Sequence, residues 1–362
     1  MTFHDMTRVS LYTPAGLTAI RHEGHVPPPP DCGRLGGVRR PLLPALLLIL
    51  LLVLTALPAA AQEAPTIQRL AGSERISTAI QIAAEEFADQ AAGAVVLARD
   101  NDFADALTGA PLAAARRAPL LLTRTDQLPA VTEAEIQRVL PAGEIVYLLG
   151  GELAISTAVG QQLEELGYEV VRLGGSNRVE TAILIAEEAA PEAGFITIAP
   201  GGDFPDALIG GSLASAFQGG VLVLTGGEED TSARDYVDAN PDALVTTIGP
   251  AAAARFPEEF NVAGDTPSER SVAAAVAFYD NAIDPSGVAL ASVEDFPDGL
   301  AGAAHAFRAG PLPLLLTPRD VLPQAHVDYI TGLDASGPSY VYGGNLAINE
   351  SVVDQLRSAL LD

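Results

Sequence analysis

The chain repeats one pattern of residues three times, and this repetition limits its possible folds more than any other feature. Residues 69–79 and 172–182 are nearly the same, and both contain the pattern Arg-x-x-Thr-Ala. The pattern Phe-x-Asp-x-Leu follows at 103–107, 204–208 and 296–300. A period of about 100 residues is too long for a solenoid unit and suits a small domain. The sequence therefore predicts one domain-sized module used three times.

Each copy continues with an apolar run that ends in threonine and a later run that ends in glycine. The threonines are Thr123, Thr225 and Thr317, and the glycine-ended runs are 147–151, 246–250 and 340–344. The copies are not equal, because the third inserts residues 265–267 before its arginine. Arg270 therefore matches either Arg75 or its neighbour Glu74. The predicted modules are 66–171, 172–260 and 261–362.

Residues 1–61 lie outside the repeats and have the pattern of an export signal. Arg39 and Arg40 precede an apolar run at 42–57, and small residues end at Ala61, after which we expect cleavage. The run is shorter than the ~20 residues of a membrane-spanning helix, although an uncleaved N-terminal anchor is the alternative. Residues 1–37 would be an unusually long segment ahead of an export signal, so we hypothesise that translation starts at Val38.

Composition excludes several classes of function. The only cysteine, Cys32, lies in the predicted signal, so the exported part would have no disulfide, thiol nucleophile or thiolate metal site. The chain has 46 acidic and 20 basic residues and a formal net charge of −26. Such a surface repels phosphate backbones and anionic lipids. We therefore expect no nucleic-acid partner and no stable membrane span after cleavage.

Helix and strand patterns alternate within each copy. Apolar residues from Ile76 to Phe87 recur with helical spacing, whereas 94–98 and 119–123 are uninterrupted apolar runs of strand length. Such runs are typical of parallel strands that are covered on both faces. A further helix is expected to begin at residues 102–105. The predicted fold class is α/β, with three tandem modules that have parallel sheets and helices on both sides.

The four patterns in fixed order, three times over, resemble the cell-wall-binding repeat type 2 family of Gram-positive bacteria, over about residues 66–362. The resemblance implies Rossmann-like or Toprim-like modules packed about a pseudo-threefold axis. It also implies noncovalent attachment to anionic wall polymers, usually beside a variable domain such as an amidase, a protease or an adhesin. This sequence departs from that arrangement because nothing remains once the three repeats are counted.

Arginines in a first helical turn are the leading candidates for a binding site, because positive charge is unfavourable there. The candidates are Arg75, Arg178 and Arg270, with the nearby Thr78 and Thr181. Each arginine either grips an acidic group of a wall polymer or pairs with an aspartate at a module interface. Solvent exposure without a partner is the third alternative.

Two further sets of repeated residues are weaker candidates. Asp105, Asp206 and Asp298 are expected to begin helices, where they either cap backbone amides or contact ligand. A cation held by Asp100, Asp102 and Asp105 is a minority interpretation, because the spacing lacks features of a calcium loop. Thr123, Thr225 and Thr317 lie at the carboxyl ends of strands, where open α/β sheets bind ligands.

The residues available for catalysis are few. After the signal, the only histidines are His305 and His326, and neither has a counterpart in the other repeats. We therefore predict a secreted, non-catalytic protein of the cell wall or cell surface, without cofactor or metal, that attaches noncovalently to anionic glycopolymer. The alternatives are an accessory protein that binds other surface proteins and, third, a secreted hydrolase that uses Asp105.

Overall fold

The computed structural model describes residues 65–361 except 104–105, 281–282 and 311. The predicted signal at 1–61, its cleavage point after Ala61 and the hypothesised start at Val38 lie outside the described residues. Asp105, one of the predicted site residues, lies outside them as well.

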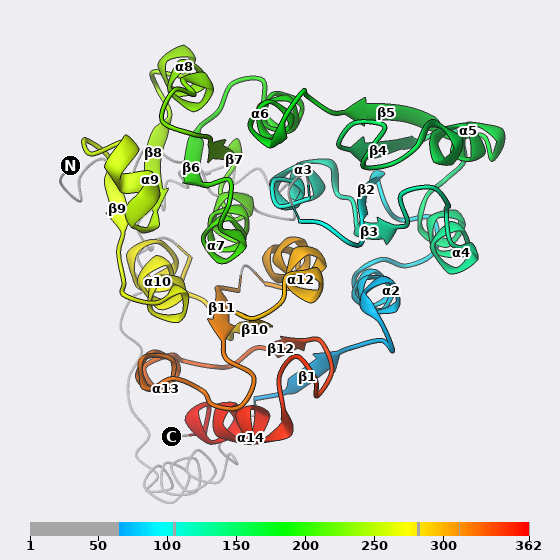
Figure 1. The fold of residues 1–362 in the computed structure, drawn as a ribbon. Helices are drawn as coiled ribbons and strands as arrows, with labels where there is room; N and C mark the ends of the chain where they lie inside the picture. The colour runs from blue at the N-terminus through cyan, green and yellow to red at the C-terminus, as the bar shows by residue number, and fades with distance from the viewer. Residues whose placement is uncertain (1–64, 104–105, 281–282, 311, 362) are drawn as a thin grey trace, which may run out of the picture. The chain divides into compact units, whose positions relative to one another are not determined.

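Strands and helices alternate along the described chain (Figure 1). The strands are β1 (Ile67–Leu70), β2 (Ala94–Arg99), β3 (Leu120–Thr123), β4 (Ile145–Leu149), β5 (Glu169–Leu173), β6 (Phe195–Pro200), β7 (Gly220–Thr225), β8 (Leu244–Ile248), β9 (Phe260–Val262), β10 (Ala289–Ser292), β11 (Leu314–Thr317) and β12 (Ser339–Tyr342). The helices are α2 (Arg75–Glu86), α3 (Gly109–Arg116), α4 (Ala130–Val139), α5 (Thr157–Glu165), α6 (Arg178–Ala189), α7 (Phe204–Ser215), α8 (Ser232–Ala239), α9 (Gly249–Arg255), α10 (Pro267–Ala274), α12 (Pro297–Arg308), α13 (Gln324–Thr331) and α14 (Glu350–Ala359). A π-helical segment, η2 (Ala275–Tyr279), continues α10.

The strands form three separate four-stranded sheets, with the orders β3-β2-β4-β5, β7-β6-β8-β9 and β1-β12-β10-β11. We call the units built on them modules 1, 2 and 3. Neighbouring strands are parallel in all three sheets. The predicted α/β fold with three parallel-sheet modules is therefore confirmed.

Repeats and sheets are offset by one strand. β5 and β9, which precede the arginine helices of the second and third repeats, are edge strands of the sheets before them. β1, which opens the first repeat, pairs with β12 and places Ile67 opposite Ser339. The first strand of the described chain thus completes the last sheet and links module 3 to module 1.

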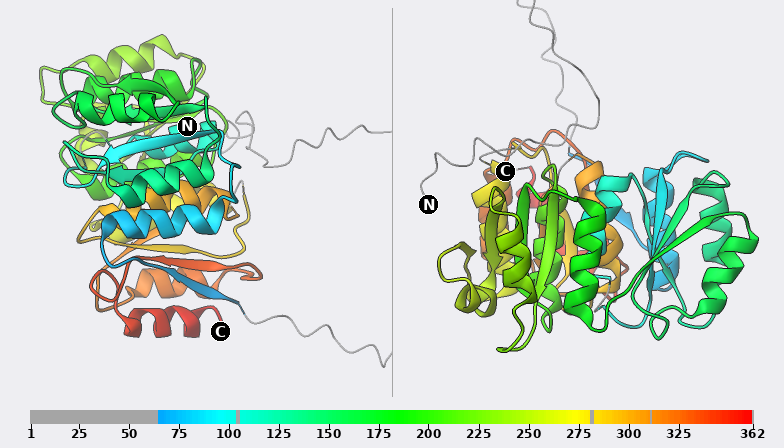
Figure 2. Two further views of the ribbon diagram at one scale, coloured as in Figure 1. Left: turned by 90° about the vertical axis from the view of Figure 1, so that its right-hand side faces the viewer. Right: turned by 90° about the horizontal axis from the view of Figure 1, so that it is seen from above.

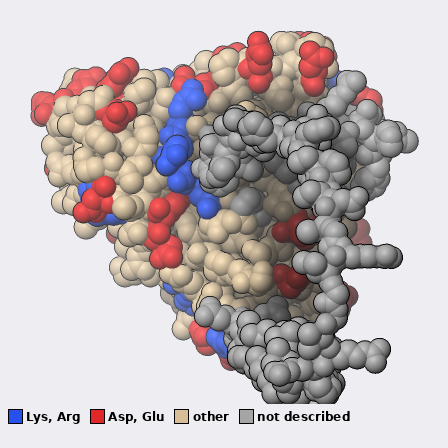
Figure 3. All heavy atoms as spheres, turned by 180° about the vertical axis from the view of Figure 1, so that it is seen from behind, with Lys and Arg blue, Asp and Glu red and all other residues tan. Residues whose placement is uncertain are grey.

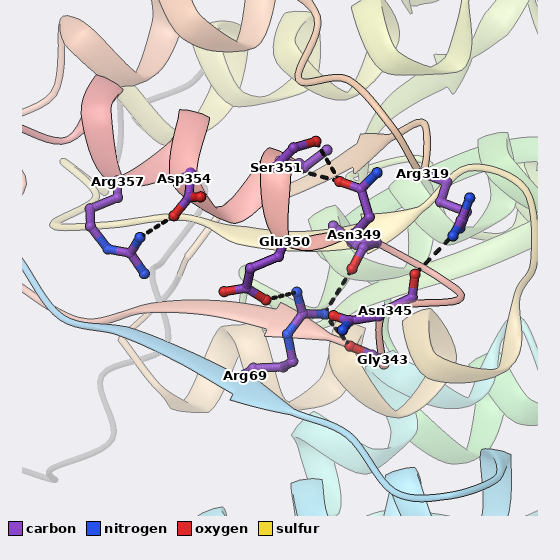
Figure 4. A network of polar contacts seen from close by, with 11 residues as sticks. Arg69, Arg319, Gly343, Asn345, Asn349, Glu350, Ser351, Asp354 and Arg357 are labelled. Atoms are coloured by element: carbon purple, nitrogen blue, oxygen red, sulfur yellow. Dashed lines mark hydrogen bonds and ion pairs between the residues drawn. The ribbon is translucent and has the colours of Figure 1, made fainter.

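Arg69 fixes this closing strand (Figure 4). One of its guanidinium nitrogens donates to the carbonyl oxygen of Gly343 at 2.7 Å, and the other lies 3.3 Å from a carboxylate oxygen of Glu350. Arg172, at the matching position of the second repeat, donates to the carbonyl oxygen of Gly150 at 3.1 Å. The arginine that opens these two repeats therefore ties an edge strand to the loop that follows its neighbouring strand.

Each uninterrupted apolar strand is buried because helices cover both of its faces, as Figure 2 shows for the modules. In β2, Val95 and Leu97 belong to a core with residues of α4 and α5. Their neighbours Val96 and Ala98 belong to a second core, which includes α3 and extends through all three modules. Burial on both faces explains the absence of polar alternation in these strands.

Helices α3, α7 and α12 contact one another at the centre of the three modules (Figure 1). The rings of Phe103, Phe204 and Phe296 meet there, with centroids 5.5 to 6.2 Å apart for all three pairs. Aromatic pairs at this distance with tilted or edge contacts are favourable. The equivalent phenylalanines therefore mark the pseudo-threefold axis, and their prediction as packing residues fits this position.

The outer ends of the module interfaces follow this symmetry only in part. Arg308 of α12 forms an ion pair with Glu86 of α2, and Arg116 of α3 forms one with Glu188 of α6 at 2.7 Å. Between modules 2 and 3, Phe278 of η2 packs against aromatic rings at the end of α7 and in β6. Ion pairs join modules 3 and 1 and modules 1 and 2 at these outer ends, and an aromatic cluster joins modules 2 and 3.

The helix expected from residues 102–105 begins later in the first repeat than in the others. α3 begins at Gly109, whereas α7 and α12 begin at Phe204 and Pro297. Proline occupies an early helical position in α7 and α12, where its fixed backbone angle favours helix. Alanine replaces that proline in the first repeat.

Replacing Gly302 with valine is expected to lower the free energy of unfolding by about 1–3 kcal/mol. A β-carbon at Gly302 would lie 2.3 Å from the ring of Tyr342. That ring cannot move aside, because Tyr342 is completely buried and its hydroxyl lies 2.9 Å from His305. Urea unfolding measures the change. The matched control is Gly151→Val, where nothing lies within 4 Å of an added β-carbon; equal losses in both variants would contradict the packing argument.

Candidate functional site

Hollows lie at the module boundaries. At each boundary the chain leaves the edge strand of one sheet and enters the first helix of the next module, which is α2, α6 or α10. We name these boundaries grooves 3–1, 1–2 and 2–3 after the modules that they separate. The turn at 72–75 enters groove 3–1, which has a cavity volume of about 850 Å³. The turn at 175–178 enters groove 1–2, with about 690 Å³. Loops at the carboxyl ends of strands line both, which is where ligands bind in open α/β sheets.

Arg75 and Arg178 occupy equivalent positions in these two grooves. Arg75 donates to the backbone carbonyl of Asp100 at 2.6 Å, and Arg178 donates to that of Gly201 at the same distance. Each guanidinium also lies 5.7 Å from the ring centroid of a phenylalanine in the preceding module, Phe296 for Arg75 and Phe103 for Arg178. These arginines thus lie between two modules and line a groove, and their contact with ligand stays a prediction.

Groove 3–1 is rich in both signs of charge. Arg124 lies 2.6 Å from one carboxylate oxygen of Asp100 and 3.0 Å from Glu74. Arg75 lies 3.7 Å from Asp295 of module 3. The other oxygen of Asp100 is buried without a hydrogen-bond partner among the described residues. Sequence reasoning missed Arg124, because no repeated pattern contains it.

Groove 1–2 combines the same kinds of group. Arg99 forms an ion pair with Asp102 at 2.5 Å, and both side chains line the groove with Glu152 and Arg178. The side chain of Asn177 caps the first turn of α6 by accepting from two backbone amides. Within the described part of the chain, no group of three or more His, Cys, Asp or Glu side chains is placed to hold a metal ion.

Thr78 and Thr181 support the turns that form the grooves. Their hydroxyl oxygens accept from the backbone N–H of Gly72 and Gly175, both at 3.1 Å. A β-carbon on either glycine would lie within 2.4 Å of atoms in the following helix. Glycine is therefore needed because the turn packs directly against the helix. The two threonines line the cavities, but their hydrogen bonds hold the turn in place.

Groove 2–3 is closed by an ion pair. Arg270 donates through Nε to a carboxylate oxygen of Asp206 at 2.6 Å, and the two side chains are only 7% and 2% exposed. A nitrogen of the same guanidinium donates to the carbonyl of Gly264 at 3.0 Å. Burial raises the pKa of Asp206 to about 6, although Arg270 favours its charged form. Arg270 thus pairs with an aspartate across the interface, and Asp206 accepts from it where a helix cap was expected.

The predicted match of Arg270 to Arg75 or Glu74 is wrong. α10 begins at Pro267, where α2 and α6 begin at Arg75 and Arg178, so Arg270 takes the place of Thr78 and Thr181.

The other predicted residues differ in their positions. Asp298 lines groove 3–1, and burial raises its pKa against the effect of a hydrogen bond from Thr78. Thr123 and Thr317 are fully buried, and their hydroxyls donate to carbonyls of the following loops. Thr225 is also buried and, like them, does not line either of the two cavities. The three threonines are therefore the buried last residues of β3, β7 and β11 and do not line either cavity.

His305 and His326 are buried inside module 3. Nδ1 of His305 lies 2.9 Å from the hydroxyl of Tyr342, and Nε2 of His326 lies 3.1 Å from the carbonyl oxygen of Leu316. Burial lowers the pKa of both side chains to about 4, helped at His305 by the charge of Arg308. Neither histidine lines groove 3–1 or groove 1–2.

These two histidines are expected to weaken the fold on acidification. Their folded-state pKa lies below the ordinary value of 6.5, so the unfolded chain binds protons first. Each then contributes a loss of about 3 kcal/mol as the pH falls from about 6.5 to about 4. Asp206, with its raised pKa, contributes in the opposite direction. The measurement is therefore the difference in stability between the unmodified chain and His305→Gln/His326→Gln across this range. An unchanged slope in the variant would contradict the assignment.

Comparisons with known proteins agree with this architecture. The family model for cell wall binding domain 2 (CWB2) matches residues 69–160, 172–255 and 261–353. The solved structures of Cwp8 and Cwp6 from Clostridium difficile superpose with TM-scores of 0.74 and 0.71, each at 23% identity. They cover 88% and 82% of this chain, which covers 55% and 48% of theirs. At this identity they show the same fold.

Two curated proteins of Bacillus subtilis (strain 168) match over shorter stretches. The N-acetylmuramoyl-L-alanine amidase LytC is 34% identical over 122 residues, which are 34% of this chain and 24% of the amidase. The protein named amidase enhancer is 35% identical over 113 residues, which are 31% of this chain and 15% of that protein. The matches therefore span a quarter or less of these relatives.

Proposed function

Because the chain belongs to the cell wall binding domain 2 family, we propose that it is an exported, non-catalytic protein that attaches noncovalently to an anionic glycopolymer of the cell wall. The observation that carries the proposal is the recurrence of a groove with the same arginine and threonine at two module boundaries. A catalytic site has no need to recur in this way, whereas repeated sites suit a polymer with repeated units. The predicted module boundaries and the location at the cell surface are part of the same proposal.

The groups in the grooves suit an acidic saccharide. Guanidinium groups bind carboxylate or phosphate in a forked geometry, and carboxylate and amide oxygens accept from hydroxyl groups. Both grooves offer these groups within one cavity, as Arg75 and Asp295 do in groove 3–1 and Arg178 and Glu152 do in groove 1–2. A glycopolymer brings acidic groups and hydroxyls together, so it complements both kinds of side chain.

Charge imposes a condition on this proposal. Acidic side chains are spread over the face in Figure 3, where some of the basic ones form a short stripe and others lie apart from it. The net charge of −26 repels an anionic polymer at long range, so attraction must come from arginines at close range or from bridging cations. Among the described residues, no helix is long and apolar enough to cross a membrane.

Binding of the purified chain to isolated cell walls tests the proposal. We expect the chain to sediment with intact walls and to remain in solution after the glycopolymer has been extracted from them. Unchanged binding to extracted walls would favour a protein partner and contradict the polymer as ligand. The same binding assay, repeated over a series of salt and calcium concentrations, shows whether attraction is direct or through cations. Release of soluble sugar or peptide from the walls would contradict the non-catalytic assignment.

A further inference from the structure

The three grooves are not equivalent, and their differences point to the number of ligands. Resting on the proposed wall-binding function, we propose that only grooves 3–1 and 1–2 bind glycopolymer, and that Leu346 and Leu153 cover the apolar face of a sugar ring there. In groove 2–3, the buried ion pair of Asp206 and Arg270 fills the space that the ligand would occupy in an open groove.

Groove 2–3 has no counterpart of Arg75 and Arg178, because Pro267 stands in their place, and the arginine that it does have is buried. The side chain of Arg75 is 35% exposed, and that of Arg270 only 7%. Asp206 lies against Gly249 as Asp298 lies against Gly343 in open groove 3–1, and β-carbons added to these glycines would lie 2.2 and 2.3 Å from the carboxylates. What distinguishes Asp206 is its ion pair with Arg270. The carboxylate of Asp206 therefore fills the space between the strand-end loop and the arginine. A polymer group cannot reach Arg270 without separating a buried ion pair.

A leucine at the rim marks each open groove. Leu153 is 92% exposed and Leu346 is 89% exposed, and they line grooves 1–2 and 3–1 respectively. Both occupy the same place in the repeated pattern Gly-Gly-x-Leu-Ala-Ile. The matching residue of the second repeat is Ala252, which is fully buried in α9. Exposed leucines are common, but these two coincide with the open grooves and are missing at the closed one.

The rim and the floor of an open groove suit different faces of one sugar unit. A pyranose ring has faces of C–H groups and edges that carry hydroxyl or acidic groups. Leu346 at the rim of groove 3–1 offers apolar surface, while Arg75 and the exposed Asp295 in the same groove offer charged donors and acceptors. A bare phosphate would use the arginine alone. The presence of both kinds of surface assigns the grooves to a saccharide unit.

Calorimetric titration with short fragments of the extracted wall glycopolymer counts the sites. We expect two fragments for each chain. Leu153→Ser and Leu346→Ser should each weaken one of the two sites roughly tenfold. The control is Val131→Ser, which replaces another exposed apolar residue, 56% exposed on α4 and outside both grooves. If the leucine variants bind as the control does, the proposed role of the rim is wrong.

Groove 2–3 is tested by removing its charges together. The double variant Asp206→Leu/Arg270→Met leaves no unpaired charge in the interface, and we expect it still to bind two fragments. A stoichiometry of three in the unmodified chain, or the loss of one site in this double variant, would overturn the inference. Failure of the unmodified chain to bind any fragment would instead contradict the proposed function, so the two proposals fail in different ways.

Discussion

Replacing Arg270 with alanine is expected to lower the free energy of unfolding by about 3–5 kcal/mol at neutral pH, because it leaves a buried carboxylate without its partner. Asp206 is 2% exposed and depends on Arg270, 2.6 Å away, for its charged hydrogen bond. Its pKa is already raised to about 6 by burial with the arginine present. Without Arg270, the carboxyl group must either stay charged in an apolar interface or bind a proton.

Urea unfolding of Arg270→Ala measures this loss. The matched control is Arg357→Ala, since Arg357 pairs with Asp354 on the surface of α14, where the side chains are 50% and 66% exposed. Exposed pairs contribute about 0–1 kcal/mol. The double variant Asp206→Leu/Arg270→Met should recover much of the stability, because it removes both charges. A loss below about 1 kcal/mol in Arg270→Ala would show that the pair does not hold modules 2 and 3 together.

Replacing both open-groove arginines, in Arg75→Ala/Arg178→Ala, is expected to weaken binding to extracted wall glycopolymer by roughly 10- to 150-fold at each groove. Hydrogen bonds to a charged group contribute about 1.5–3 kcal/mol each, and 1.4 kcal/mol corresponds to a tenfold change in affinity. Attachment to the wall depends on both open grooves acting together, so retention on intact walls should fall further. Equilibrium titration with the polymer measures the change.

Three comparisons make this result specific. Arg75→Lys/Arg178→Lys keeps the charge but loses the forked donors, and it should bind with intermediate affinity. Arg357→Ala removes an exposed arginine of α14, outside both grooves, and should bind normally. Circular dichroism checks that the double alanine variant stays folded, since Arg75 and Arg178 also contact strand-end carbonyls. Normal polymer binding by a folded double alanine variant would exclude these arginines as ligand contacts.

Local patterns in the sequence are enough to predict the α/β modules. Uninterrupted apolar runs such as 94–98 indicate strands covered on both faces, and the structure buries both faces of β2. The spacing from Ile76 onward indicates the helix that begins at Arg75. The threefold repetition adds the number of modules. These predictions succeed because they depend on the burial of residues that are close in sequence.

The pairing of β1 could not be predicted from the same patterns. β1 opens the first repeat, yet it pairs with β12 at the far end of the chain. Its own sequence is compatible with any of the three sheets, because β1, β5 and β9 play the same part in successive repeats. Only closure of the modules about one axis decides the partner, and a local pattern contains no information on that closure.

Whether a groove is open or closed also depends on tertiary structure. The sequence suggests an insertion at 265–267 and a match of Arg270 to Arg75 or Glu74, whereas in the structure Arg270 takes the place of Thr78 and is buried against Asp206. Local patterns did not predict this contact. Leu153 and Leu346 do carry a signal in the sequence. Leu153 lies two residues before Ile155, where the apolar stripe of the following helix begins, and so off its buried face. An apolar residue out of phase in two repeats is a sign of an exposed functional position.

The most direct test of the account is hydrogen exchange of the whole chain with and without short glycopolymer fragments. We predict slower exchange at the two open grooves, in residues 72–78, 151–154, 175–181 and 344–347, and no change in residues 249–254 and 264–270. Protection confined to other surfaces, or equal protection at all three module boundaries, would contradict an attachment site built from two open grooves and one closed by its own ion pair.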